Sequence, residues 1–68
     1  MKITYIEAKK LSEYFKIDHE KTPFREFWAG LDMEMEYADI KNGNKYIIAQ
    51  IVIAHLEENP RYYKFFIT

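Results

Sequence analysis

The sequence has 68 residues, a formal net charge of -1 and no cysteine. A chain of this size forms one domain, residues 1–68, and buries only roughly 60% of the surface that its unfolded form exposes, so we expect modest stability. The lack of cysteine excludes disulfides and thiolate zinc sites and favours a reducing compartment, so the cytoplasm is the expected location.

The first predicted helix covers residues 5–17. Thr4 is a suitable N-cap, and Glu7 lies three residues further on, which is the spacing of a capping box. Apolar side chains in this segment fall roughly on one helical side. They are Ile6, Leu11, Tyr14, Phe15 and Ile17. The polar residues 18–21 then form a loop.

The second predicted helix runs from Pro23 to about Ala38. Thr22 followed by Pro23 is the preferred order of a cap and a first helical residue. The residues that follow place an apolar stripe at three- and four-residue intervals, although Gly30 costs the helix roughly 1 kcal/mol relative to alanine. The stripe consists of Phe24, Phe27, Trp28, Leu31, Met35 and Ala38.

A β-hairpin is the alternative structure for residues 33–53. Apolar and acidic residues alternate over residues 33–37, Asn42-Gly43 is a favoured hairpin turn, and residues 47–53 are rich in β-branched side chains. This alternative would make the fold α+β.

A third helix from Asn44 to Glu58 is the preferred interpretation. Asn44 is a suitable cap, and a segment that is apolar on most sides fits a central helix. Asn59 then caps again, and Pro60 opens a short helix through Phe66. We therefore predict an all-α fold, a compact bundle of three helices plus a short C-terminal helix. The predicted core contains Trp28, Leu31, Ile47, Ile51, Leu56 and Phe65.

His55 and Glu58 are the first candidates for chemistry. They lie three residues apart on one helix face, so together they could hold a metal ion. A stable site needs two more ligands, for which Glu34 and Glu36 are the candidates. We expect instead a hydrogen-bonded structural histidine and no metal or cofactor, with one of the two glutamates reaching a tyrosine hydroxyl, His55 or a helix N-terminus.

The C-terminal segment combines aromatic and basic residues, as stacking platforms for single-stranded nucleic acid do. Arg61 and Lys64 are only two positive charges, too few for strong attraction to nucleic-acid phosphates. Residues 26–40, in addition, carry five acidic and no basic side chains. The aromatic residues here, Tyr62 and Tyr63 among them, recur at helical spacing. We therefore expect them to fold over the bundle and expect no nucleic-acid partner.

Other functional classes lack their signals in this sequence. No apolar run approaches the roughly 20 residues that span a bilayer, and no signal peptide is recognisable in MKITYIEAKK, so we expect no membrane association. Ser12 has no histidine at a readable spacing, and neither glycine belongs to a phosphate-binding loop. We therefore expect no catalytic residues of a recognised type.

Two motifs of this chain resemble those of a family of short uncharacterised domains, of unknown function, in proteins of bacteria, phages and large DNA viruses. The pattern is F-x-x-G-L-x-x-E-x-E, then a variable insert, then I-x-x-A-H-L-x-E-x-P-x-Y-Y. The matching residues are Phe27, Gly30, Leu31, Glu34, Glu36, Ile51, Ala54, His55, Leu56, Glu58, Pro60, Tyr62 and Tyr63.

The resemblance implies that six of the residues weighed above form one spatial cluster. These are Glu34, Glu36, His55, Glu58, Tyr62 and Tyr63. It implies no activity. The chain departs from the family pattern at Tyr37, Ala38 and Arg61, where the family has histidine, glycine and aspartate, and the lost histidine weakens a metal site further. The variable insert fits a loop between helices better than a tight hairpin turn.

The sequence thus predicts a small protein-interaction module, with a phage or viral accessory role, that binds a protein partner or a second copy. Twelve aromatic residues supply the side-chain types from which interfaces draw binding energy. The alternative is a metal-assisted hydrolase that uses Glu34, Glu36, His55 and Glu58.

Overall fold

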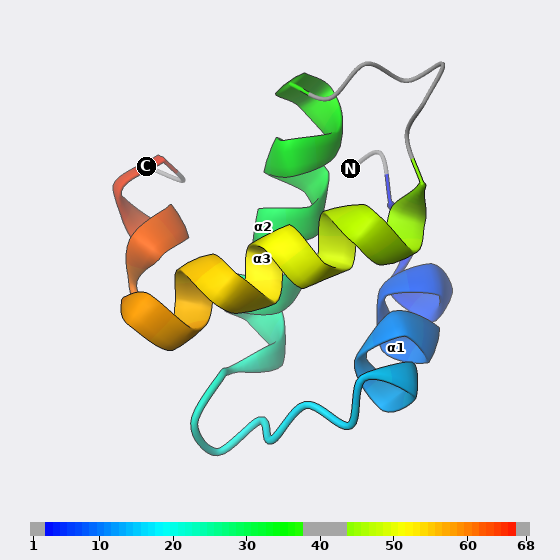
Figure 1. Ribbon diagram of the computed structural model, residues 1–68, viewed down its shortest axis with the longest axis horizontal. Helices are drawn as coiled ribbons and strands as arrows, with labels where there is room; N and C mark the ends of the chain where they lie inside the picture. Colours follow the sequence, from blue (N-terminus) through cyan, green and yellow to red (C-terminus); the bar gives the residue numbers. More distant parts are fainter. Residues whose placement is uncertain (1–2, 38–43, 67–68) are drawn as a thin grey trace.

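The computed structural model describes residues 3–37 and 44–66. Three α-helices follow one another, α1 (Tyr5–Tyr14), α2 (Phe24–Tyr37) and α3 (Lys45–Glu58), and a short 3-10 helix, η2 (Tyr62–Phe66), comes last (Figure 1). These residues contain no strand, so the predicted all-α fold is confirmed. Within these two ranges no helix has the length and apolar character needed to cross a membrane.

Both segments of the alternative hairpin are helical. Residues 33–37 end α2 and residues 47–53 lie inside α3, while Asn42-Gly43 lies outside the described residues. The alternation at the end of α2 is misleading because Met33 and Met35 both pack against the core as partly buried side chains. Flexible methionines can reach the core from neighbouring positions on a helix.

Side-chain caps fix the start of two helices as predicted. Thr4 Oγ1 accepts a hydrogen bond from the backbone N–H of Glu7 at 3.1 Å, and the Asn44 side chain accepts one from the N–H of Tyr46 at 2.8 Å. Helix α2 begins at Phe24, and the carbonyl of Pro23 accepts its first backbone bond from Phe27. These contacts satisfy N–H groups that the first helical turn leaves without partners.

Helix α1 ends at Tyr14, three residues before the predicted end. Lys16 adopts a left-handed backbone with φ of 53°, its N–H donates to the carbonyl of Glu13, and the N–H of Ile17 donates to the carbonyl of Ser12. This pair of bonds is the Schellman arrangement, which commonly uses glycine at the left-handed position. Lysine there concealed the helix end from sequence reasoning.

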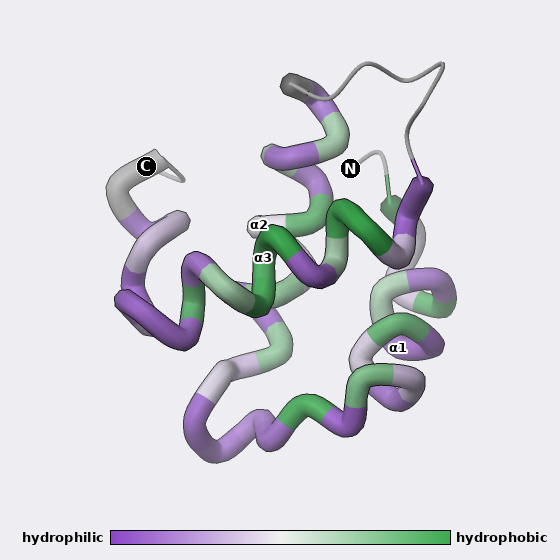
Figure 2. Tube along the Cα trace, in the orientation of Figure 1, coloured by the Kyte–Doolittle hydropathy of each residue, from purple (hydrophilic) through white to green (hydrophobic). Residues whose placement is uncertain are grey.

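The helices pack around α2. Helix α3 crosses α2, α1 lies beside the start of α3, and the connection between α1 and α2 is mostly hydrophilic (Figures 1 and 2). Among the side chains that the structure describes, ten apolar ones form the buried core. They are Ile3, Ala8, Leu11, Phe27, Leu31, Ile48, Ala49, Val52, Leu56 and Tyr63.

Two predicted core residues are on the surface instead. Leu31 and Leu56 are buried and Trp28 is half-buried, but Ile47 is 54% exposed and Ile51 is 41% exposed. The side chain of Phe65 lies outside the described part. Helix α3 is apolar on most sides, so its sequence did not indicate which side faces α2.

The segment before α1 is tied to α2 by two long-range hydrogen bonds. The indole N–H of Trp28 donates to the carbonyl of Ile3 at 2.7 Å, and the N–H of Ile3 donates to Oδ1 of Asp32 at 3.2 Å. At the other side of α1, Glu7 pairs with Lys45, and this ammonium group together with Thr4 lowers the pKa of the Glu7 carboxyl. These contacts fix α1 against both α2 and α3.

Replacing Lys16 with glycine is expected to raise the free energy of unfolding by about 0.5–1 kcal/mol. A left-handed residue with a Cβ costs roughly 1–2 kcal/mol, and the greater unfolded-state freedom of glycine offsets only about 0.5–1 kcal/mol of that gain. The matched control is Lys10→Gly at an exposed position inside α1, expected to lower stability by about 1 kcal/mol. Urea unfolding measures both, and a less stable K16G protein would contradict the assigned backbone.

Candidate functional site

The chain reverses direction after α3 and brings η2 back onto the bundle. The N–H of Asn59 donates to the carbonyl of His55, and the Asn59 side chain accepts from the N–H of Arg61 at 3.0 Å. Pro60 is exposed in this turn, and η2 then packs against α2 and α3 (Figure 1). The predicted C-terminal helix is therefore present, but it begins at Tyr62 rather than at Pro60 and is a 3-10 helix.

Gly30 makes room for the ring of Tyr63. A Cβ atom at Gly30 would lie 2.7 Å from Cε2 of Tyr63 and 2.7 Å from Cγ1 of Val52, closer than real Cβ contacts come. Tyr63 and Val52 are both fully buried. A glycine inside a helix costs stability, and at this position it permits η2 to approach α2 closely.

The buried hydroxyl of Tyr63 joins side chains from α2 and α3. It donates to Oε1 of Glu34 at 3.0 Å, and Nδ1 of His55 lies 2.9 Å from the same hydroxyl oxygen. His55 Nδ1 and Glu34 Oε1 are 3.5 Å apart. The side chains of His55 and Glu34 keep 32% and 24% of their surface exposed, so the network lies at the edge of the core.

The single proton of the Tyr63 hydroxyl determines which groups in this network donate and which accept. A phenol has one proton, and here it points to the carboxylate of Glu34. The hydroxyl oxygen therefore accepts from His55, so Nδ1 of His55 carries a proton. In the neutral imidazole, Nε2 then holds the lone pair and is the ring atom able to accept a proton or a hydrogen bond.

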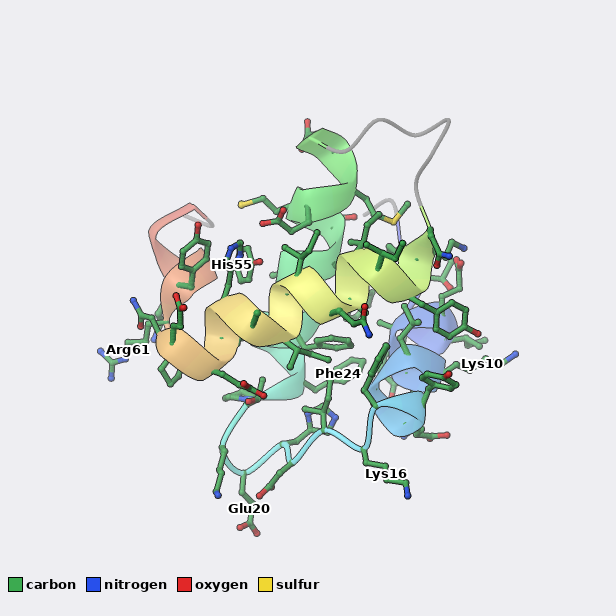
Figure 3. All side chains as sticks on the ribbon, viewed as in Figure 1. Lys10, Lys16, Glu20, Phe24, His55 and Arg61 are labelled. Carbon is green, nitrogen blue, oxygen red and sulfur yellow. The ribbon has the colours of Figure 1, made fainter. Side chains whose placement is uncertain are left out.

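Tyr62 covers the other side of the imidazole. Its ring stacks on that of His55 with centroids 4.3 Å apart and an interplanar angle of 20°, and it meets the ring of Tyr63 edge-on at 4.9 Å. His55 thus lies between α3 and η2, with its orientation set by a hydrogen bond and a stacked ring (Figure 3).

Burial raises the pKa of the Tyr63 hydroxyl well above its ordinary value, and the nearby negative charge of Glu34 raises it further. A buried phenolate would lose its hydration, and it would repel the carboxylate to which the neutral hydroxyl donates. Tyr63 is therefore neutral throughout the physiological pH range.

The structure brings together four of the six predicted cluster residues, Glu34, His55, Tyr62 and Tyr63. Glu36 and Glu58 are exposed and lie outside this hydrogen-bond network. Glu34 reaches a tyrosine hydroxyl, as expected for one glutamate of the pair. Sequence reasoning noted Gly30 only as a helix cost and missed its contact with Tyr63.

The cluster does not provide a complete metal site from the part of the chain that the structure describes. No group of three histidine, cysteine or carboxylate side chains converges there in a way that could hold an ion. The predicted hydrolase site needs at least three such ligands. What the geometry supplies is one oriented imidazole, fixed by a neutral phenol and a carboxylate.

The variant Gly30→Ala is expected to lower the free energy of unfolding by about 1–2 kcal/mol, although alanine is the better helix former by roughly 1 kcal/mol. The new methyl group would overlap with Tyr63 and Val52. The control is the same substitution in a Val52→Ala background, where one overlap is gone and the loss should be smaller. Thermal or urea unfolding measures the effect, and a stabilised G30A protein would contradict the packing.

The variant Tyr63→Phe is expected to cost about 1 kcal/mol at neutral pH because Glu34 and His55 lose their shared partner. Since folding raises the pKa of Tyr63, its contribution is fully present below pH of about 10 and is lost as the pH rises above that value. The stability difference between native protein and variant should therefore be constant from pH 7 to 9 and shrink by up to about 1.4 kcal/mol per pH unit above pH 10. A difference that stays constant to pH 11 would show that the hydroxyl titrates normally.

Comparison with known proteins supports one assignment. Residues 8–67 match a protein family described as "Protein of unknown function (DUF5661)". Searches against curated proteins and against solved structures gave no match. The match covers nearly the whole sequence, including every residue of the Glu34, His55, Tyr62 and Tyr63 cluster, and the chain belongs to the DUF5661 family.

Proposed function

We propose that the protein is a small protein-interaction module that binds its partner through the exposed apolar side of α3. The observation that carries this proposal is the exposure of Ile47 and Ile51, at 54% and 41%, on the helix that also supplies much of the core. Large aliphatic side chains that remain accessible next to one another are typical of binding surfaces.

Four exposed residues of α3 lie on one helical face. Ile47, Gln50, Ile51 and Ala54 are all exposed and follow one another at intervals of three, one and three residues, which places them on one helical face. We call these four residues the α3 stripe. The buried residues of α3, such as Val52, lie on the opposite face, where the helix crosses α2 (Figure 1).

Two tyrosines extend the apolar surface at the start of α3. The rings of Tyr14 and Tyr46 meet edge-on with centroids 4.9 Å apart, and the two residues are 67% and 51% exposed. Tyrosine supplies large contact area with little loss of side-chain freedom, and it is enriched among residues that dominate binding energy. The surface therefore combines aliphatic and aromatic contacts across α1 and α3.

The side chains around Tyr63 have a structural role within this module. Its hydroxyl both donates and accepts, its ring fills the space beside Gly30, and its neighbours hold η2 in place. The metal-assisted hydrolase remains the second hypothesis, and it requires further ligands to converge on His55. No observation on the described residues favours it over the interaction module.

We also propose a cellular location and a class of partner for this module. The sequence has no cysteine, which fits a reducing cytoplasm, and its acidic segment 26–40 disfavours nucleic acid as the partner. An accessory protein of a phage or virus, binding a larger component, is the biological role that we attach to it. The resemblance described above motivates that role.

Replacement of both isoleucines by lysine, Ile47→Lys with Ile51→Lys, is expected to change the free energy of unfolding by no more than about 0.5 kcal/mol because both side chains are on the surface. The matched control, Leu56→Ala, removes a buried side chain of the same helix and should cost about 2–5 kcal/mol. Urea unfolding compares the two. A large loss in the double variant would place the isoleucines in the core.

Photo-crosslinking then tests the binding function itself. A photoreactive residue at position 51 should give discrete crosslinked products in cell extract, and an excess of the native protein, but not of the double lysine variant, should compete them away. The control carries the same group at Glu20, an exposed position in the loop between α1 and α2. Equal crosslinking at positions 51 and 20 would contradict the proposal.

A further inference from the structure

We infer that the partner of the α3 stripe is a second copy of this chain, with the two α3 helices packed antiparallel across a twofold axis near Gln50 and Ile51. This inference rests on the proposed function, since it names the occupant of the same surface. It follows from the spacing, the side-chain sizes and the charges along α3.

The spacing of the stripe is that of a helix seam. Within the stripe, Ile47, Ile51 and Ala54 are separated by four and three residues, and Glu58 follows outside the stripe four residues later, which is the alternation of core positions in paired helices. Only the last position carries a charge. The apolar seam is therefore short and is centred close to the middle of α3, which spans Lys45–Glu58.

The sizes of the side chains fit an antiparallel twofold pairing. An axis between residues 50 and 51 places Ile47 of one copy opposite Ala54 of the second copy, and Gln50 opposite Ile51. A large side chain then meets a small one at both ends of the seam. Such alternation allows paired helices to interdigitate without a void.

The charges along α3 select the antiparallel orientation over the parallel one. The last turn carries Glu57 and Glu58, both exposed, while the first turn contains Lys45 and no acidic residue. Glutamates at a helix C-terminus are disfavoured by the helix dipole, and helix N-termini attract them. Antiparallel packing places the glutamates of each copy next to the first turn of the other, whereas parallel packing would bring all four together.

The size of the surface sets the strength of the dimer. A helix of 14 residues is about 21 Å long, so a single pair of such helices buries less than the roughly 1,200–2,000 Å² of stable complexes. Tyr46 adds contact area beside the stripe. We therefore expect a weak dimer, with a dissociation constant in the range of about 10 μM to 1 mM.

Sedimentation equilibrium on the purified full chain tests for the dimer. The native protein should change from monomer to dimer with rising concentration, and Ile51→Lys should raise the dissociation constant at least about tenfold because it charges the centre of the seam. The control Glu20→Gln makes the same change of one positive unit in net charge away from α3 and should leave association unchanged. A native protein that stays monomeric up to about 1 mM would overturn the inference.

Single cysteines test the orientation, since the native chain has none. Under mild oxidation, a mixture of Ile47→Cys and Ala54→Cys chains should form mainly the mixed disulfide, and neither chain alone should crosslink efficiently. Glu20→Cys reports the background of random collision. Self-crosslinking of Ile47→Cys with itself, above that background, would indicate parallel packing and overturn the antiparallel arrangement.

Different results would overturn the dimer and the interaction module. A strictly monomeric protein whose position 51 still crosslinks to another protein in extract would overturn the dimer and leave the interaction module standing. A protein that neither dimerises nor crosslinks at position 51 above the Glu20 control would overturn both.

Discussion

The hydroxyl of Tyr63 connects three elements of the fold, α2, α3 and η2. It donates to Glu34 on α2 and accepts from His55 on α3, while its ring occupies the space left by Gly30. The C-terminal turn is thereby closed over the crossing of α2 and α3. A chain of 68 residues has few core positions, and Tyr63 fills one of them with a large aromatic ring whose hydroxyl has hydrogen-bond partners.

The fixed position of α3 has a consequence on its outer side. Because Ile48, Val52 and Leu56 face the core, the same helix must present Ile47 and Ile51 to solvent. A helix that is apolar all round is normally buried all round. The exposed side of α3 is therefore the feature that the isolated fold leaves unexplained, and its composition is the reason why we propose it as a binding surface.

Sequence patterns predicted most of the helix ends in this fold well. Thr4, Asn44 and Asn59 mark helix ends through contacts with their immediate neighbours, so their roles are readable from short windows. The end of α1 was misplaced because Lys16 occupies a left-handed position usually held by glycine. The rotational setting of α3 could not be predicted either, since isoleucine occurs on both its buried and its exposed sides.

The candidate site was likewise predicted only in part from the sequence. The resemblance grouped Glu34, His55, Tyr62 and Tyr63, but it also grouped Glu36 and Glu58, which are exposed on their helices. Helix geometry alone separates Glu34 from Glu36, since residues two apart point in different directions. Which of the two faces the core depends on how α2 meets η2, and that contact depends on the packing of Tyr63 beside Gly30.

A double-mutant cycle between Glu34→Gln and Tyr63→Phe tests this account most directly. Urea unfolding of the native protein, the two single variants and the double variant gives the coupling energy between the two side chains. A coupling of about 0.5–2 kcal/mol is what a shared hydrogen bond predicts, so the double variant should be more stable by that amount than the sum of the two single losses implies. Losses that simply add, with no coupling, would contradict the central place given to the Tyr63 hydroxyl.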